Sequence, residues 1–356
     1  MKILLSWLND YGDFGDPTDP AAVARVAEAL TSLGLEVDSV DVVGETVPGV
    51  VAARVLRLEQ HPDAAKVQRV YVDAGDGEER HVWCGAFNMA VGDVVPLATL
   101  GTTMPNGMTI ERRGILGIDS EGMLCSASEL GLGDDHSGIR VLPADATLGA
   151  PYGDALGVRP DVLIDADVTR NRPDCWGYVG IARDLAAKLH VAFTPPTPSL
   201  EVTGDERSAT VAIVADERCP RFTSTVISGV EVKPSADWMA QRLTAAGMRP
   251  ISNVVDVSNY VMLELNQPNH AYDLDTLGGG GFRVRLAHDG EELTTLDAER
   301  RTFTDTDLFL CDATDTPIGV AGIMGGLDTE ISESTTTIAL EMAWFSLIGI
   351  GQTVTR

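Results

Sequence analysis

The chain has 356 residues, enough for two or three domains that each bury a core, and its 44% hydrophobic content is typical of globular packing. It carries 26 Lys and Arg against 53 Asp and Glu, so its formal net charge is 26 − 53 = −27. Because contacts to phosphate need cations, so acidic a chain is a poor non-specific nucleic-acid binder, although a local basic strip is compatible with this charge.

The cysteines are spread along the chain without a C-x-x-C pair, at Cys84, Cys125, Cys175, Cys219 and Cys311. No signal peptide is visible, so free thiols in a reducing compartment are expected and a zinc or other metal site is not. No apolar window approaches the length of a membrane span. We therefore predict a soluble cytoplasmic protein.

Residues 1–48 are expected to form a small α/β piece. Asp19 and Pro20 are a typical helix start, because proline is favoured at the first helical position. Apolar residues then recur at helical spacing, at Val23, Val26, Leu30 and Leu33. Gly34 follows where a C-terminal cap belongs, and residues 35–43 alternate like a strand. This piece is expected to serve packing or subunit contact.

Residues 49–150 predict a small β-barrel. Short strand-like runs are separated by Gly, Asn and Asp at even spacing, and they span residues 50–60, 66–75, 80–86, 94–101 and 109–117.

Three motifs in this barrel carry a resemblance. H-P-x-A-x-K lies at residues 61–66, C-G-A closes residues 82–86, and S-x-G-M-L-C-S covers residues 120–126. In combination they resemble the tRNA-binding OB-fold of the phenylalanyl-tRNA synthetase β subunit and of free-standing tRNA-binding proteins. The sequence departs from that pattern at Ala65, where Asp or Lys is more usual, and at Phe87-Asn88, where Pro-Asn is more usual.

An OB barrel offers a strand face and loops that hold an irregular nucleic-acid backbone. The cations expected to contact tRNA phosphates are Lys66, Arg69, Arg112 and Arg113. The alternative is that these four residues are ordinary solvated surface charge.

Residues 151–200 are expected to form a helical connector and a linker. Residues 171–174 (N-R-P-D) indicate a turn into a helix, with Asp174 as a possible cap. The helix would present a core-facing stripe of Val179, Ala182, Leu185 and Leu189. In residues 193–200 the prolines forbid regular structure, so this run is expected to be the linker.

Residues 201–350 contain the stretch on which a functional reading depends, Gly247–Leu277. A turn at Gly247 and Pro250 precedes an apolar run, and a Gln-Pro-Asn-His turn then delivers His270 beside Tyr272. A histidine held in this way can face a pocket. The alternative is that His270 is only a turn residue whose ring nitrogens already have hydrogen-bond partners.

A glycine-rich run at residues 318–326 permits close backbone approach. It lacks the G-x-x-x-x-G-K-[ST] pattern of a phosphate loop, so a loop lining a small-molecule pocket is the better interpretation. A strand expected over residues 335–341 ends on Glu341, which is either exposed or kept inside for a polar partner.

Residues 167–345 resemble the editing domain of the bacterial phenylalanyl-tRNA synthetase β subunit. Besides Gly247–Leu277, the matching motifs are N-R-P-D-C at 171–175, G-I-A-R-D at 180–184, C-P-R-F at 219–222, A-G-I-M-G-G at 321–326 and A-L-E-M-A at 339–343. The fold implied is a multidomain α+β protein, in which an OB-fold barrel is inserted in a small α/β N-terminal domain and a mixed α+β editing domain follows.

The resemblance implies hydrolysis of tyrosine wrongly attached to tRNA(Phe). Glu341 corresponds to the carboxylate that recognises the tyrosine hydroxyl, His270 to a histidine near the scissile ester, and Asn259 to a pocket-lining amide. The residues expected to form the substrate-binding wall are Ala321, Gly322, Met324 and Gly325. No Ser or Cys has a convincing partner base, so attack by a positioned water is expected, with His270 or the hydroxyls of the tRNA end assisting.

The resemblance also implies a larger assembly. The family's β subunit continues into modules that dock on a catalytic α subunit in an α2β2 heterotetramer, and aminoacylation with ATP and Mg2+ belongs to that whole enzyme. This chain is expected to hold no cofactor and to deacylate without making Phe-tRNA. The alternative hypothesis is a truncated or paralogous tRNA-binding module without catalytic activity.

Overall fold

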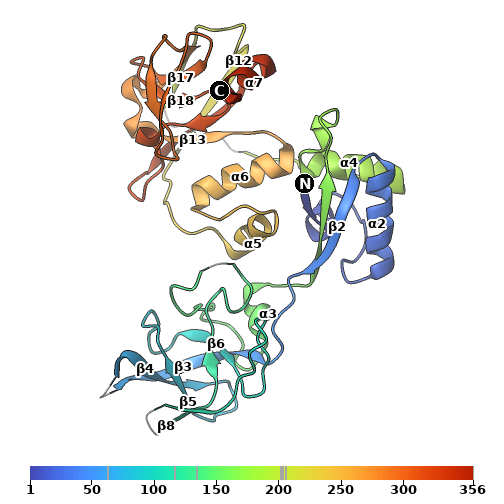
Figure 1. Ribbon diagram of the computed structural model, residues 1–356, viewed down its shortest axis with the longest axis vertical. Coiled ribbons are helices and arrows are strands. Elements are labelled where there is room, and N and C mark those ends of the chain that lie inside the picture. Colours follow the sequence, from blue (N-terminus) through green and yellow to red (C-terminus); the bar gives the residue numbers. More distant parts are fainter. Residues whose placement is uncertain (62–63, 116–117, 134, 201–203, 205–206, 356) are drawn as a thin grey trace.

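The computed structural model describes residues 1–61, 64–115, 118–133, 135–200, 204 and 207–355. The elements form three groups: a small N-terminal α/β unit at the right of Figure 1, a barrel-like sheet at the bottom, and a larger C-terminal α+β unit at the top. Residues 62 and 63 of the H-P-x-A-x-K motif lie outside the described residues.

The N-terminal unit contains an antiparallel sheet in the order β1-β10-β2. Its strands are β1 (Lys2–Leu4), β10 (Asp161–Asp167) and β2 (Glu36–Val43). Because β10 lies between the other two, residues that precede and follow the barrel share one sheet (Figure 1). Around it lie α1 (Leu5–Leu8), α2 (Pro20–Ser32) and α4 (Tyr178–Leu189), and their apolar faces form a common core.

Both helices expected here are present. In α2 the Asp19 carboxylate accepts a hydrogen bond from the Ala21 amide at 3.0 Å, which satisfies a free donor of the first turn. In α4 the expected stripe faces the core, but its N-cap is Gly177, so the predicted cap at Asp174 is wrong. Asp174 instead lies in a short 3-10 helix, η1 (Pro173–Cys175), where arginines bind its carboxylate.

The barrel-like sheet has the order β5-β4-β3-β6-β9, and its edge strands β5 and β9 contact each other. Its strands are β3 (Val50–His61), β4 (Ala64–Asp73), β5 (Arg80–Cys84), β6 (Val94–Ala98) and β9 (Met123–Leu124). A hairpin of β7 (Arg113–Ile115) and β8 (Ile118–Ser120) and the helix α3 (Tyr152–Leu156) complete this part. The predicted small β-barrel corresponds to this barrel-like sheet, whereas the strand expected over residues 109–117 is reduced to Arg113–Ile115 and, among the described residues, pairs only within its own hairpin.

The C-terminal unit packs two sheets face to face. The smaller has the order β12-β20-β13, from β12 (Arg221–Ser228), β20 (Thr337–Trp344) and β13 (His270–Asp273). The larger contains β11 (Thr210–Ile213), β14 (Gly281–Leu286), β17 (Leu308–Asp312), β18 (Pro317–Val320) and β19 (Met324–Gly325). One apolar cluster joins their facing sides, with Phe222, Tyr272 and Ala339 from the smaller sheet and Phe282, Leu310 and Ile318 from the larger.

The remaining elements of this unit lie outside these sheets, with α6 and α5 below them in Figure 1. They are α5 (Asp237–Ala245), α6 (Asn253–Leu265), α7 (Leu347–Val354), the hairpin β15 (Glu292–Thr294) and β16 (Arg300–Thr302), and the 3-10 turns η2 (Leu274–Thr276), η3 (Gly278–Gly280) and η4 (Leu327–Thr329).

Helix α6 is held against the N-terminal unit by aromatic stacking. The Trp7 ring lies between Tyr178, with ring centroids 3.8 Å apart, and Tyr260 of α6, at 4.5 Å. Arg242 of α5 donates to the Tyr260 hydroxyl at 2.8 Å and to Asp10 at 2.6 Å. Such buried aromatic pairs add to the stability gained from the area they bury, so α6 is a fixed element between the two units.

Candidate active site

A row of polar side chains crosses the smaller C-terminal sheet. In the register of this sheet, Glu341 of β20 pairs with Ser224 of β12 on one side and with His270 of β13 on the other. Residues paired directly across strands place their side chains on the same face. On that face the neighbouring residues Phe222 and Ala339 belong to the apolar core, so the row is a polar strip within it.

The position of Glu341 differs from the expectation. The strand was predicted to end at this residue, but β20 continues to Trp344. The reason is that β12 pairs with β20 along its whole length, and this pairing carries the backbone past the carboxylate. Glu341 is therefore inside a strand with a partner on each side.

Glu341 is buried, with 7% of its surface exposed. The hydroxyl of Tyr272 donates a hydrogen bond to its Oε2 atom at 3.1 Å. Burial raises the pKa of Glu341 to about 7, and the bond from Tyr272 acts in the opposite direction because it favours the charged form. Burial and the neighbouring carboxylate raise the pKa of Tyr272, so the phenol keeps its proton and remains a donor.

His270 is a neutral imidazole at neutral pH, because burial lowers its pKa to about 4. Its ring lies edge-on to Tyr272, with centroids 4.5 Å apart. Gly325 lies against the other side of the ring, since a Cβ atom at this position would be 2.8 Å from Nε2 of His270. A neutral imidazole has one ring nitrogen that accepts a hydrogen bond, so this histidine is able to hold a water or a hydroxyl group.

Asn259 lies on α6 and is partly buried. No described hydrogen bond joins its side chain to His270 or to Glu341. The same helix is nevertheless connected by hydrogen bonds to the residue before His270. Ser258 donates to the Asn269 carbonyl at 2.9 Å, and the Asn269 amide group donates to the Ser258 carbonyl at 3.1 Å, immediately before His270.

The glycine-rich run divides into two parts. Gly325 packs on His270, whereas a Cβ on Gly322, which has a φ of +70°, would be 2.9 Å from Phe345 and Ile350. Ala321 is buried in the core of the unit, and Met324 is 36% exposed. Of the four residues predicted to line the substrate, Gly325 is the one that the structure places beside the histidine.

Two amides of this run already have acceptors in the protein. The amide of Ile323 donates to the Val320 carbonyl at 3.0 Å, and that of Gly326 to the Ile318 carbonyl at 2.7 Å. These two amides are therefore not available as free donors to a ligand.

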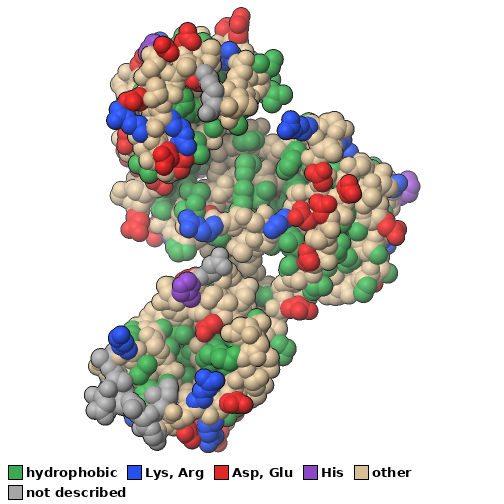
Figure 2. All heavy atoms as spheres, in the orientation of Figure 1, with side chains coloured by type: hydrophobic (Ala, Val, Ile, Leu, Met, Phe, Trp, Pro, Cys, Tyr) green, Lys and Arg blue, Asp and Glu red, His purple; other side chains and the backbone are tan. Residues whose placement is uncertain are grey.

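The cations predicted to contact tRNA differ in their surroundings. Lys66 and Arg113 are exposed, without a described ion pair, while Arg112 pairs with Glu121 at 3.0 Å. Arg69 is held by Glu59 at 3.3 Å and lies over the rings of Tyr71 and Trp83. On the face drawn in Figure 2, Lys and Arg on the barrel alternate with Asp and Glu.

Sequence reasoning missed a cluster of arginines and rings on the outer face of the barrel. The Arg57 guanidinium lies 3.4 Å from the centroid of the Tyr71 ring, and the Tyr71 and His81 rings are neighbours with centroids 5.1 Å apart. The signal was present for Tyr71 and His81, which alternate with core valines of β4 and β5. It was absent for Arg57, which lies two residues after the core residue Val55 and is separated from it by a register shift in β3.

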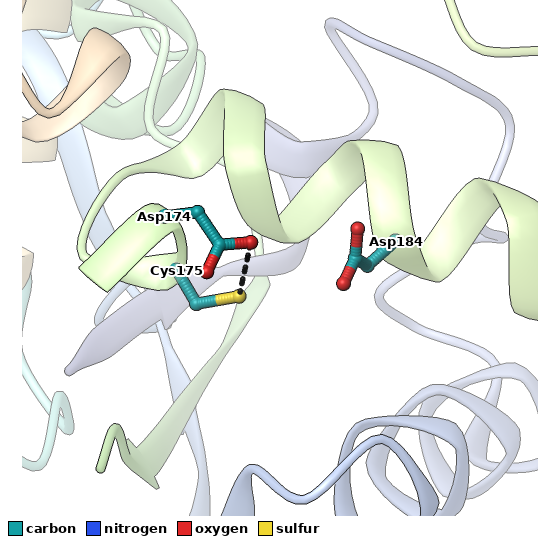
Figure 3. A group of neighbouring side chains, drawn as sticks. All are labelled: Asp174, Cys175 and Asp184. Carbon is teal, nitrogen blue, oxygen red and sulfur yellow. Dashed lines mark hydrogen bonds between the residues drawn. The ribbon is translucent and has the colours of Figure 1, made fainter. Parts of the chain in front are cut away.

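One group of side chains in the described part of the chain is close enough to hold a metal: Asp174, Cys175 and Asp184 (Figure 3). The guanidinium of Arg172 already lies among them, donating to Asp174 at 3.1 Å, to the sulfur of Cys175 at 2.8 Å, and to Asp184. Burial raises the pKa of Cys175 to about 11, so the thiol is not a ready metal ligand. Through these contacts of Arg172, the group connects η1 to α4.

Two further residues of the row were missed from the sequence, Tyr272 as the partner of Glu341 and Ser224 as its neighbour on β12. Alternation along β12 places Ser224 on the same face as the core residue Phe222, and this signal was not used.

Two cavities are described in the protein. The cavity of about 560 Å³ lies between α2 and β2, and the cavity of about 390 Å³ lies on the barrel.

Two family models match the chain. The model described as a putative tRNA binding domain matches residues 50–151, and the model described as a B3/4 domain matches residues 218–356. The polar row lies within the second match and the barrel within the first. Among the residues that the structure describes, no helix has both the length and the apolar character needed to cross a bilayer.

Relatives match over the full length of the chain. A phenylalanine–tRNA ligase β subunit from Anaeromyxobacter dehalogenans is 45% identical over 358 residues, which cover 100% of this chain and 44% of the relative. The β subunit from Nitratidesulfovibrio vulgaris is 41% identical over the same shares of the two chains.

A solved N-terminal fragment of the phenylalanyl-tRNA synthetase β subunit from Pyrococcus horikoshii is 16% identical, covers 55% of this chain and 60% of that one, and has a TM-score of 0.32, too low to show a shared arrangement. The chain spans less than half the length of the curated relatives it matches. By sequence it belongs to the phenylalanine–tRNA ligase β-subunit family.

Proposed function

We propose that this chain binds tRNA(Phe) through its barrel and hydrolyses tyrosine wrongly attached to that tRNA, at the row of Glu341 and His270. The observation that carries the proposal is the contact between Tyr272 and Glu341. In it, a buried carboxylate beside a neutral imidazole already accepts a hydrogen bond from a phenol. The same carboxylate has a second oxygen with which to accept one from a substrate.

The chemistry explains why such a site is useful. An apolar pocket that accepts phenylalanine cannot strongly reject tyrosine, which differs only by a hydroxyl group. A second site that hydrogen-bonds this hydroxyl discriminates in the opposite sense, because phenylalanine would leave the buried carboxylate without its partner. Glu341 is suited to this role because it is buried and, among the described residues, forms no ion pair with a cation.

Water is the nucleophile in this proposal. Cys219 lies near Glu341, but burial and the charge of Glu341 raise the pKa of its thiol to about 11, so it is a poor nucleophile at neutral pH. The neutral ring of His270 accepts a hydrogen bond from the attacking water and orients it towards the ester carbonyl. The C–O bond to the tRNA ribose then breaks, and the ribose oxygen leaves with a proton.

In the whole enzyme, this activity would support phenylalanylation of tRNA by the α subunit. The α2β2 assembly, ATP and Mg2+ belong to that aminoacylation reaction, and no step assigned to this chain involves them.

The test is a deacylation assay with the purified chain on Tyr-tRNA(Phe) and Phe-tRNA(Phe). We expect selective loss of tyrosine, with a fall of at least about 100-fold in kcat/KM in His270→Ala, because a group that acts on the reacting centre is removed. In Glu341→Ala we expect a fall of about 10- to 100-fold for the tyrosyl ester, because the hydrogen bond from the phenol to a charged acceptor is lost. Glu333→Ala is the matched control, because Glu333 is an exposed acid of the same unit. Binding of tRNA without hydrolysis would contradict the proposal and favour a binding module.

A further inference from the structure

The hydroxyl of Ser224 has no partner in the protein. Its Oγ atom is inaccessible to solvent and makes no hydrogen bond. Leaving a buried hydroxyl unpaired destabilises a protein, so most buried polar atoms have a partner and each exception needs an explanation. Phe222 and Val226, on the same face of β12, are apolar residues of the surrounding core and offer no partner.

The neighbour of Ser224 across the sheet is Glu341. Cβ atoms of directly paired residues are about 5 Å apart. No hydrogen bond joins the two side chains, and the Glu341 bond to Tyr272 uses Oε2 alone. An unpaired hydroxyl and a carboxylate oxygen thus lie side by side on one face of the sheet.

We infer that Ser224 is a second specificity-determining residue of the proposed site, whose hydroxyl donates a hydrogen bond to the phenol oxygen of a tyrosyl substrate while that phenol donates to Glu341. The inference rests on the proposed function.

The chemistry of the two side chains selects a hydroxyl group as the ligand. A carboxylate only accepts, so the ligand group must donate to Glu341. The serine hydroxyl must donate to satisfy its own proton, so the same ligand group must also accept. An ammonium or an amide N–H only donates and a carbonyl only accepts, whereas a phenol does both. Phenylalanine offers neither function and would leave both protein groups unpaired.

The test compares hydrolysis of Tyr-tRNA(Phe) and Phe-tRNA(Phe) by the full chain and by Ser224→Ala. We expect the ratio of the two kcat/KM values to fall about tenfold, the effect of one lost hydrogen bond, through the tyrosyl substrate alone. Ser224→Thr keeps the hydroxyl and is expected to retain most of the ratio. Thr225→Ala, on the exposed face of the same strand, is the matched control and should match the parent.

Thermal unfolding separates recognition from structure. Because the alanine removes an unpaired hydroxyl, Ser224→Ala should unfold at the same temperature as the parent or higher, while its tyrosyl selectivity falls. In a Glu341→Ala background the further change to Ser224→Ala should leave the ratio unaltered, because the phenol is no longer held there.

Several outcomes would overturn the inference. An unchanged ratio in Ser224→Ala, with selectivity lost in Glu341→Ala, refutes the role of Ser224 and leaves the proposed function standing. An equal fall for the tyrosyl and phenylalanyl esters shows that Ser224 holds a water or the local structure, not the phenol. If the parent chain hydrolyses neither ester, the proposed function fails and the inference fails with it.

Discussion

The hydrogen bond from Tyr272 to Glu341 acts on the charge of the carboxylate. Burial brings the pKa of Glu341 to about 7, and the phenol counters part of this effect because it favours the ionised form. Only the ionised carboxylate offers two acceptor oxygens without a proton on either. At the residue scale, the activity of the site should therefore depend on pH near neutrality.

Tyr272→Phe tests this dependence. Hydrolysis of the tyrosyl ester by the parent should rise with pH through a midpoint near 7, as Glu341 loses its proton. Removing the phenol raises the pKa of Glu341, so the midpoint should move to higher pH and the loss of rate should be greatest below it. The measurement is kcat/KM from pH 6 to 9, the range of the assay. A profile that keeps its midpoint in the variant would refute the role of Tyr272.

At the scale of elements, α6 and β13 meet through the reciprocal bonds of Ser258 and Asn269. These bonds fix the backbone immediately before His270, so the helix determines where the histidine ring lies on the sheet. Ser258 is in this sense a positioning residue that touches no reacting atom.

Ser258→Ala should lower kcat for the tyrosyl ester by roughly three- to tenfold, since one hydrogen bond of about 1 kcal/mol is lost and the backbone before His270 loosens. The KM for the tRNA, which we propose that the barrel binds, should not change. Ser258→Thr retains the hydroxyl and should restore kcat. Val257→Ala, on the exposed side of the same helix turn, is the control. A change in KM alone would argue against a positioning role.

Elements were predictable from the sequence where the signal is local. The cap at Asp19 and the apolar spacing in α2 predict that helix, and alternation predicts the strands of the barrel. The pairing of Glu341 with His270 and Ser224 could not be derived in this way. It depends on the register between strands far apart in the chain, which is determined by the packing of the two C-terminal sheets and not by local spacing.

At the scale of the whole molecule, the proposed tRNA binding would have to occur against a net charge of −27. Most arginines of the barrel are already paired, as Arg112 is with Glu121, so the contribution of each remaining cation should be easily measured. Charge composition could not distinguish free from paired cations, because this distinction requires the cross-strand neighbours.

Lys66→Ala and Arg113→Ala should each weaken tRNA binding and reduce the slope of log affinity against log salt by about 1, as expected when one phosphate contact is lost. Arg112→Ala should have a smaller effect, because this guanidinium already has an acidic partner. The measurement is a salt titration of tRNA affinity. Equal effects in all three variants would show that the ion pair of Arg112 opens on binding.

The register of β20 has a consequence for how the protein tolerates insertions and deletions. Side chains of a strand alternate between its faces, so one residue added or removed between Ala339 and Glu341 would move the carboxylate to the opposite face, where Ile338 and Leu340 pack in an apolar cluster with α6, and would bring Met342 to the inner face. The resulting chain would keep its composition and nearly all its residues, yet lose the polar row. Length variation in this unit should therefore be confined to its loops, and a two-residue change in β20 should be less harmful than a change of one.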